Sequence, residues 1–259
     1  MAPRMNTRGY TRSGNVYYRD NIYSGTRGAS LWETAPMLAA MSDPGSYFFY
    51  QEDFRTLLDL TNDWAAVKDG VVVPIQLDAA GGVLSIPTDV TNNNEHYLSS
   101  IAENWKFAAS KPLWFEARVA LTEANVDDAN LIVGLSDTVA ADSLLDNGAG
   151  PMASYDGAVW FKVDGGTVWQ FETSNAATQV TTASAGAFAS NTFYRVGFIY
   201  DPLAGTTGEV TPYLNGVAGA AHAITLAGLE EMHILLGAKA GGGAAETLRV
   251  DYVQVLAVR

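Results

Sequence analysis

The sequence predicts an all-β protein, an antiparallel β-sandwich that carries an extended N-terminal arm. Short segments rich in aromatic and β-branched residues recur along residues 45–259, and several alternate apolar with polar side chains, the two-residue period of a strand. Turn-forming residues separate these segments, and no long helical pattern interrupts them. Regularly spaced short strands of this kind are typical of a sandwich or jelly roll.

Two hairpins are the most specific local predictions. Asp164-Gly165-Gly166 fits a three-residue bulged hairpin, and Asn215-Gly216 is typical of a type I′ turn, whose two central residues need positive φ. The glycine- and alanine-rich residues 183–189 and 237–245 are interpreted as loops. The predicted strands span residues 47–50, 71–77, 82–87, 113–121, 131–135, 158–163, 167–171, 193–200, 208–214, 233–236 and 248–258.

The composition limits the function. The chain is 48% hydrophobic and 17% charged, which supplies a large core and few solubilising charges. It has no cysteine, so a disulfide framework, a thiol nucleophile and a thiolate metal site are excluded. The first ten residues contain no apolar leader and no window reaches eighteen apolar residues, so we expect neither an exported precursor nor a membrane partner.

The charge is divided unevenly along the chain. The net charge is −13, but residues 1–30 contain five arginines and one acid, which leaves −17 on residues 31–259. An acidic body repels nucleic-acid phosphates, so we expect no nucleic-acid partner. Because Asp43-Pro44-Gly45 is a strong break, we divide the chain into a basic arm, residues 1–44, and a jelly-roll domain, residues 45–259.

Arginines alternate with tyrosines within the arm. Both residue types are favoured at the centres of protein interfaces, and four tyrosines within fourteen residues are unusual for a disordered tail. Ser30 and Glu33 have the spacing of a capping box, which predicts one or two helical turns as far as Met41. We predict that the arm orders on a neighbouring subunit. Its partner-binding residues would be Arg4, Arg8, Tyr10, Arg12, Tyr17, Tyr18, Arg19, Tyr23, Arg27 and Trp32.

The end of the chain resembles a known fold. Residues 248–255, Leu-Arg-Val-Asp-Tyr-Val-Gln-Val, contain the Asp-Tyr-Val-x-Val pattern that is common in the closing strand of concanavalin A-like lectin/glucanase jelly rolls. The predicted strand at 113–121, the tryptophan-bearing hairpin at 158–171 and the turn at 213–216 follow in the order that this fold uses. The resemblance covers residues 47–259.

A second resemblance concerns residues 43–54, Asp-Pro-Gly-Ser-Tyr-Phe-Phe-Tyr-Gln-Glu-Asp-Phe. They look like the opening of tailed-bacteriophage virion proteins in which an arm precedes a jelly roll of this type. The resemblance implies a structural protein of the virion, made in the host cytoplasm, such as a head decoration or cement protein. It also implies a homo-oligomer, with a trimer favoured, that binds the major capsid protein or other virion subunits through its arm and needs no cofactor.

Enzyme chemistry would need a particular carboxylate arrangement. A glucanase of this fold carries a nucleophile and an acid on one face of one strand, as in Glu-x-Asp-x-x-Glu, and the chain has no such spacing. Glu52 and Asp53 are adjacent and point to opposite faces, and Glu116 is far in sequence from Glu123. No Gly-x-Ser-x-Gly elbow for a serine nucleophile occurs. We therefore expect a protein that is not an enzyme.

Metal sites are also disfavoured by spacing. The acidic loops Asp127-Asp128-Ala129-Asn130 and Asp142 with Asp146-Asn147 offer oxygen ligands, but neither matches a calcium loop. The three histidines lack the spacing of a zinc site, and we expect surface or core histidines. They are His96, His222 and His233.

Aromatic side chains leave an alternative open. Pyranose rings stack on exposed tryptophans, and alternation places Trp160 on the same face as Lys162, which suggests the wetter face. Against this, large aromatics mostly fill the core of a sandwich. The alternative function is a carbohydrate-binding, lectin-like module or a tail-associated receptor-binding protein. Its candidate sugar platform is Trp64, Trp105, Trp114, Trp160 and Trp169.

Overall fold

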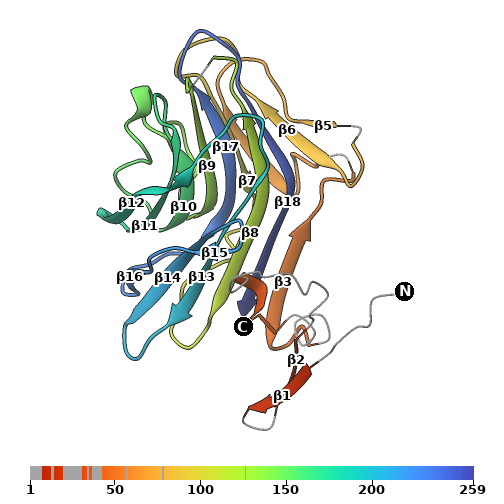
Figure 1. Cartoon of the computed structure of the whole chain (residues 1–259), viewed down its shortest axis with the longest axis vertical. Helices are drawn as coiled ribbons and strands as arrows, with labels where there is room; N and C mark the ends of the chain where they lie inside the picture. Colours follow the sequence, from red (N-terminus) through yellow and green to blue (C-terminus); the bar gives the residue numbers. More distant parts are fainter. Residues whose placement is uncertain are drawn as a thin grey trace.

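The chain folds into two antiparallel sheets packed face to face, as the computed structural model in Figure 1 shows. The structure describes residues 8–12, 15–19, 31–33, 35–36, 43–56, 58–77, 79–125 and 127–259. The predicted fold class, an antiparallel β-sandwich of the jelly-roll type, is confirmed.

One sheet has seven strands and the other has nine. The strands of the seven-stranded sheet are β4 Trp64–Lys68, β7 Glu95–Ser100, β9 Ala129–Ser136, β10 Gly157–Lys162, β11 Val168–Asn175, β12 Thr178–Ala187 and β17 His233–Ala240. The strands of the nine-stranded sheet are β3 Tyr47–Glu52, β5 Ile75–Leu77, β6 Val83–Pro87, β8 Leu113–Thr122, β13 Tyr194–Pro202, β14 Thr207–Leu214, β15 Val217–Ala218, β16 His222–Thr225 and β18 Thr247–Val258.

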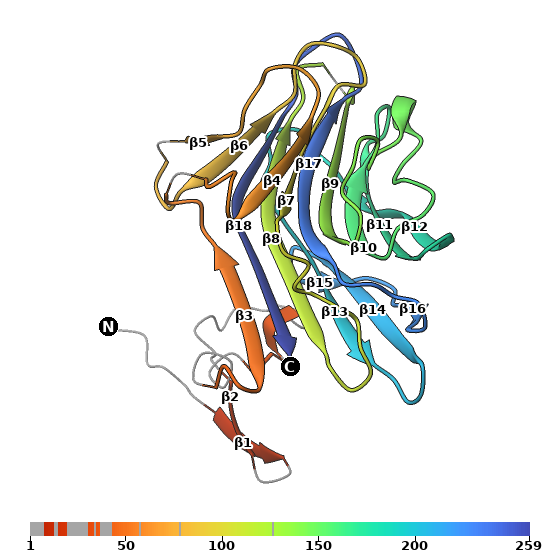
Figure 2. The same ribbon diagram turned by 180° about the vertical axis from the view of Figure 1, so that it is seen from behind.

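The strand order shows how far apart in sequence the neighbours are. The seven-stranded sheet runs β12-β11-β10-β9-β17-β7-β4, and the nine-stranded sheet runs β15-β14-β13-β8-β18-β6-β5, with β16 beside β14 and β3 beside β18. β3 and β6 lie one after the other along β18, β3 against residues 253–258 and β6 against residues 247–250 (Figure 2). The chain therefore passes repeatedly between the sheets, and β5 is left at one edge.

The core lies between the two sheets and is filled by alternate residues of each strand. Phe115 of β8 stacks on Phe198 of β13 with ring centroids 5.0 Å apart. From the opposite sheet, Phe171 of β11 approaches Phe198 at 6.0 Å, and the Trp160 Nε1–H donates to the Gly197 carbonyl at 2.9 Å. The apolar side chains that alternate along the strands thus pack together as one core between the sheets.

Both predicted hairpins form, but the first does not have the predicted three-residue loop, because β10 ends at Lys162 and β11 begins at Val168. Gly165 has a φ of 72°, and the Gly166 N–H donates to the Val163 carbonyl at 3.0 Å between β10 and β11. After β14, Asn215 and Gly216 have φ values of 52° and 81°, the positive pair that a type I′ turn requires. The turn residues therefore set the register of these two hairpins.

Several predicted boundaries are wrong. Residues 183–189 were expected to form a loop, but β12 extends to Ala187, and β17 runs to Ala240 across part of the second predicted loop. Only residues 75–77 of the predicted strand at 71–77 pair with a neighbour, and β4 and β7 were not predicted. The small residues of β12 have weak strand propensity, and the strand forms because its main chain pairs with β11.

The arm contains three short elements among its described residues. They are β1 Arg8–Arg12, β2 Asn15–Arg19 and the 3-10 turn η1 Leu31–Glu33. The predicted helical turns are thus reduced to η1, and Ser30 and residues 37–41 lie outside the described residues. The division of the chain at residues 44 and 45 remains a prediction. Within the described ranges, no helix has the length and apolar character needed to cross a membrane.

Candidate functional site

The arm holds a β-hairpin that contains six of the ten predicted partner-binding residues. Its register places Arg8 opposite Arg19 and Tyr10 opposite Tyr17, and β1 and β2 form a two-stranded sheet of their own. Trp32 is partly buried in an apolar cluster on the sandwich. The six residues in the hairpin are Arg8, Tyr10, Arg12, Tyr17, Tyr18 and Arg19. The three that lie outside the described residues are Arg4, Tyr23 and Arg27.

Leu31 anchors the end of the arm on the outer face of the nine-stranded sheet. Its side chain is completely buried against Trp114 of β8, Ile199 of β13 and Leu256 of β18. The sheet makes room for it at Gly197, because a methyl group there would lie 2.6 Å from the Leu31 Cδ1. The arm therefore leaves the sandwich from a fixed apolar point. The sequence analysis missed Leu31, although it adjoins the predicted Trp32.

A long loop covers the outer face of the seven-stranded sheet. Residues 137–156, between β9 and β10, place Leu144 and Tyr155 against apolar side chains that point outward from the sheet. These sheet residues are Tyr97, Ile132, Val159, Phe161 and Leu235. This face is therefore filled by the protein's own chain.

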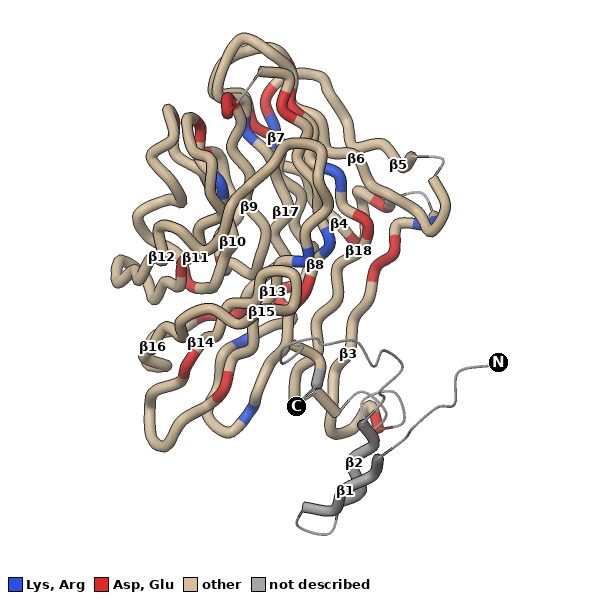
Figure 3. Tube along the Cα trace, viewed as in Figure 1, with Lys and Arg blue, Asp and Glu red and all other residues tan. Residues whose placement is uncertain are grey.

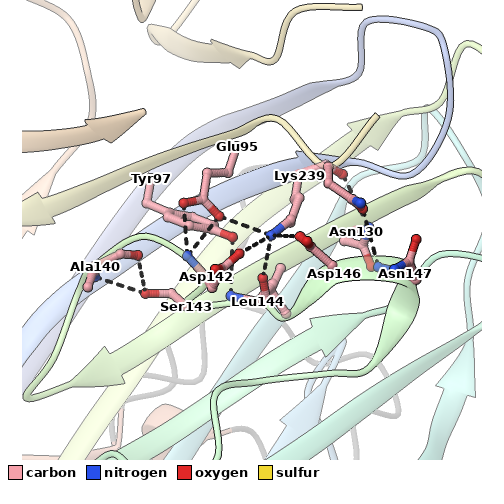
Figure 4. Close-up of polar contacts among 11 residues, drawn as sticks. Glu95, Tyr97, Asn130, Ala140, Asp142, Ser143, Leu144, Asp146, Asn147 and Lys239 are labelled. Atoms are coloured by element: carbon pink, nitrogen blue, oxygen red, sulfur yellow. Dashed lines mark hydrogen bonds and ion pairs between the residues drawn. The ribbon is translucent and has the colours of Figure 1, made fainter. Parts of the chain in front are cut away.

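Lys239 holds this loop in place with three carboxylates (Figure 4). Its Nζ lies 2.6 Å from Asp142 Oδ1, 2.6 Å from Asp146 Oδ1 and 3.3 Å from Glu95 Oε2. It also donates to the Leu144 carbonyl at 2.9 Å. The Lys239 side chain is 1% exposed, so these contacts replace water around a buried charge. Asp142 and Asp146, which the sequence analysis considered as calcium ligands, form ion pairs with Lys239.

The pKa values in this cluster follow from burial and pairing. Burial opposes the charge of Lys239, but its hydrogen bonds to Asp142 and Asp146 and the charge of Glu95 outweigh it and raise the pKa of the ammonium. Burial raises the pKa of Glu95, and the Asp142 N–H and Lys239 oppose that shift. The lysine is therefore charged at neutral pH. Its role is to neutralise Glu95 on the sheet and the two aspartates of the loop.

Lys162 forms a second buried cluster at the end of β10. Its ammonium pairs with Glu123 and donates to the carbonyls of Asp127 and Ala129 at 3.0 and 2.9 Å. The Lys162 side chain is fully buried. The sequence analysis weighed the wetter face for Trp160 against the core, and the core, which it favoured for large aromatics, is confirmed. Trp160 and Lys162 both lie on the inner face, because the ammonium finds its oxygen partners inside the protein.

Glu246 lies beside this cluster, and only one of its two carboxyl oxygens has a hydrogen-bond partner among the described residues. Its Oε2 accepts from the Ala124 N–H at 2.8 Å, and its Oε1 is buried without a partner among the described residues. Burial raises the pKa of Glu246, and the charges of Glu123 and Asp128 add to that effect. The folded protein therefore binds the Glu246 proton more tightly than the unfolded chain does.

Replacing Glu246 with glutamine is expected to stabilise the protein more at pH 8 than at pH 4. A raised folded-state pKa favours the folded state at acid pH, and this contribution is lost as the pH rises toward that pKa. The amide keeps an acceptor for the Ala124 N–H and removes the charge, a gain of about 1 kcal/mol in unfolding free energy. Thermal unfolding of both proteins at pH 4 and pH 8 measures it. Equal gains at both pH values would contradict this account, and Glu230→Gln on the surface is the control.

The predicted glucanase candidates are placed apart. Glu116 lies buried on the outer face of the nine-stranded sheet, where its Oε1 accepts from the Tyr252 hydroxyl at 2.7 Å. Glu123 pairs with Lys162, and Glu52 Oε1 accepts from the main-chain N–H groups of Asp53 and Phe54. Within the described strands, these carboxylates do not form a pair on one face of one strand.

The predicted sugar platform is not exposed. Trp64, Trp105, Trp160 and Trp169 are each no more than 1% exposed, and Trp114 is 4% exposed beneath Leu31. They pack in the core or under the arm because the sandwich needs large apolar side chains there. A glycan could not stack on these rings without unfolding the protein.

Each of the three histidines makes its own contacts, separate from those of the other two. His96 Nδ1 lies 2.8 Å from the Pro87 carbonyl, His222 contacts Thr173 and Thr182, and His233 Nδ1 lies 2.7 Å from the Ser100 carbonyl. Across the part of the chain that the structure describes, no three carboxylate, histidine or cysteine side chains meet in a way that could hold a metal ion.

Several solved structures share this fold. An endo-1,3-β-glucanase from Streptomyces sioyaensis is 13% identical with a TM-score of 0.57, over 83% of this chain and 97% of that chain. The potassium-bound carbohydrate recognition domain of Emp46p is 11% identical with a TM-score of 0.53, over 79% and 94%. A protein of unknown function from Shewanella oneidensis MR-1 is 16% identical with a TM-score of 0.52, over 82% and 87%. Protein-family models and curated protein sequences give no match.

These likenesses correct one prediction and confirm another. The concanavalin A-like lectin/glucanase jelly roll is confirmed as the fold. The prediction that the chain is not an enzyme is contradicted, because endo-glucanases use the same architecture. At these identities the likeness shows the fold alone. The fold is thus one that serves both glycan recognition and glycan cleavage in other proteins.

Proposed function

We propose that this protein is a subunit of a larger protein assembly, specifically a tailed-bacteriophage virion, whose jelly roll is joined to neighbouring subunits by the N-terminal arm. In this proposal the neighbours are the major capsid protein or further copies of the chain, with a homotrimer as the favoured oligomer. A head decoration protein that stabilises the capsid is the specific form of the proposal.

The observation that carries the proposal is the anchor at Leu31. A completely buried leucine fixes the start of the sandwich, and the thirty residues before it carry a net charge of +4 against −17 on the rest of the chain. A fixed exit point limits the volume that the arm explores, which lowers the entropic cost of binding a neighbour. A basic arm on an acidic body is suited to bind the acidic surface of another subunit.

The start of the sandwich supports the same reading. β3 follows the arm and pairs with β18, and the Arg259 N–H donates to the Ser46 carbonyl at 2.9 Å. Figure 1 shows the C-terminus close to η1 and to the start of β3. Tension on the arm would therefore be carried by a strand that is paired with the longest strand of the sheet.

Deleting residues 1–28 tests this function. We expect the truncated protein to unfold at nearly the same temperature as the full chain, because Leu31 and the whole sandwich remain. We also expect it to lose binding to purified particles, measured by co-sedimentation. A full-length variant with its five arm arginines replaced by glutamine separates the role of charge from that of length. Particle binding that is undiminished by the truncation would contradict the proposal.

Glycan recognition is a second candidate, favoured by the likeness to the Emp46p carbohydrate recognition domain. The tryptophans are buried, so a glycan would have to use a polar surface instead. One cleft beside the turn between β5 and β6 offers a guanidinium, an amide and main-chain groups. Its lining residues are Arg55, Gln76, Leu77, Ala79, Gly81 and Gly82. A glycan array tests this candidate with the unmodified full chain and with the double variant Arg55→Ala, Gln76→Ala. The candidate predicts glycan binding by the unmodified chain and none by the variant.

A further inference from the structure

A stripe of apolar side chains is exposed along the segment that contains β5. Val71 is 91% exposed, Val73 51%, Ile75 53% and Leu77 36%. These four residues alternate with residues that are only partly exposed, so they point away from the body of the protein. Single exposed apolar residues are ordinary, but four that alternate along one seven-residue segment are unusual and suggest an interaction site. We call these four residues the edge stripe.

The edge stripe lies at the open edge of the nine-stranded sheet. β5 is the last strand in the sheet order, and among the described strands it pairs only with β6 (Figure 1). On its other face, the Gln76 Nε2–H donates to the Phe54 carbonyl at 2.6 Å, which holds the segment against the body. No charged residue occurs from Val71 to Leu77, although edge strands are usually protected by charge. Pro74 removes one N–H, so the stripe offers apolar contact more than a long main-chain ladder.

Acidic residues surround the edge stripe in sequence. Residues 50–80 contain six acids and two bases, a net charge of −4. Both bases are already engaged, since Arg55 pairs with Asp53 at 3.3 Å and Lys68 donates to the Val72 carbonyl. Figure 3 shows that acidic positions outnumber basic ones over the sandwich. The six acids are Glu52, Asp53, Asp59, Asp63, Asp69 and Asp78.

The arm has the complementary chemistry. Residues 1–30 carry a net charge of +4 and four tyrosines, whose rings combine an apolar face with a polar end. The strands β1 and β2 pair only with each other among the described strands, so the hairpin keeps an unpaired edge. The exposed apolar stripe and the six acids that flank it in sequence, here called the acidic rim, fit an aromatic segment with arginines beside the tyrosines.

We propose that the edge stripe of one subunit binds residues 1–30 of a second copy of this chain. The proposal rests on the proposed function, since it names the surface on which the arm docks. Exchange of arms between copies buries the exposed valines and isoleucine and pairs the arginines with the acidic rim. Reciprocal exchange closes a dimer, and exchange in one rotational direction closes a ring such as a trimer.

Self-association of the full chain is the first test. We expect an oligomer in light scattering, and we expect the double variant Val73→Asp, Ile75→Asp to raise its dissociation constant about 100-fold. Higher salt should weaken the wild-type oligomer, because the charges lie at an exposed rim. The matched control is Val180→Asp, Val217→Asp, which alters two exposed valines on other strands and should leave association unchanged. A monomeric wild type, or equal losses in both variants, would overturn the proposal.

A cross-linking experiment identifies the two partners directly. The chain has no cysteine, so the single variants Tyr17→Cys and Val73→Cys each carry one thiol. We expect a mixture of the two to form a disulfide-linked dimer on oxidation, and a mixture of Tyr17→Cys with Val217→Cys to form none. The double variant Tyr17→Cys, Val73→Cys completes the test. A disulfide that forms within this single chain, while the mixture of single variants forms none, would show that the arm binds its own stripe and would overturn the proposal.

The particle-binding test of the truncated chain and the self-association test of the edge-stripe variant separate this inference from the proposed function. If deletion of residues 1–28 abolishes particle binding while the edge-stripe variant associates normally, the arm binds another surface. The inference would then be overturned, and the assembly function would stand.

Discussion

Replacing Lys239 with methionine is expected to destabilise the protein by about 3–5 kcal/mol in unfolding free energy. The substitution keeps the length of the side chain but removes the charge that neutralises Glu95, Asp142 and Asp146. Glu95 is 3% exposed and cannot regain water without movement of the loop at residues 137–156. We therefore expect the loop to open, exposing the apolar face beneath it to solvent.

Chemical unfolding and limited proteolysis measure the two effects of Lys239→Met. The difference from the wild type should narrow between pH 7 and pH 4, because burial raises the pKa of Glu95 and its protonation removes a buried charge that the lysine neutralises. The lysine's own contribution is present below the pKa of a free lysine and is lost only in alkaline solution, because its folded-state pKa is raised. Lys111→Met on the exposed surface is the control. A variant as stable as that control at pH 7 would contradict the role given to the cluster.

Replacing Leu31 with alanine is expected to release the arm while leaving the sandwich folded. A completely buried leucine contributes about 2–5 kcal/mol to the contact that it fills. The contact lies on the outer face of the nine-stranded sheet, outside the main core. The loss should therefore be local, and the melting temperature should change much less than for a core substitution.

Hydrogen exchange distinguishes this local release from unfolding. The Ala35 amide, which donates to the Trp32 carbonyl at 3.3 Å, should exchange at least about 30-fold faster in Leu31→Ala, which corresponds to about 2 kcal/mol, while the amides of β8 and β18 keep their protection. Leu60→Ala, which changes a leucine that is 41% exposed, is the matched control. Unchanged exchange at Ala35 would contradict the anchor. The variant should also bind particles more weakly, since the arm would lose its fixed exit point.

Much of the fold was predictable because local chemistry and long-range pairing agree. The Asn215-Gly216 turn formed as predicted, and a hairpin formed at Gly165 with a longer loop than predicted, since few other residues accept the positive φ values at these positions. Aromatic and β-branched runs such as those in β8 and β18 have a strong preference for strands. Residues 183–187 of β12 were not predictable as strand, because alanine, serine and glycine carry little strand preference and this part of β12 depends on pairing with β11.

The site was less predictable because it depends on which face of each strand is buried. Alternation correctly grouped Trp160 with Lys162, but the charge of the lysine suggested water, whereas Glu123 and two carbonyls satisfy it inside the protein. The loop that covers the seven-stranded sheet has no sequence signature that links it to Lys239, a residue more than ninety positions away. Burial of a charge is a property of the tertiary structure, and one sequence does not reveal it.

The fold and the function are separate questions for this protein. Glucanases and a carbohydrate recognition domain share its jelly roll at 11–13% identity, so the architecture supports several kinds of function. The proposed assembly function rests instead on the basic arm, the Leu31 anchor and the exposed edge stripe, which includes β5 of the sandwich.

An electron cryomicroscopy map of the assembled protein on its particle tests the account most directly. The account predicts continuous density for the arm, leading from Leu31 onto a neighbouring polypeptide and covering acidic surface there. Density for residues 1–28 that lies wholly on the arm's own sandwich, with no contact to a neighbour, would contradict it.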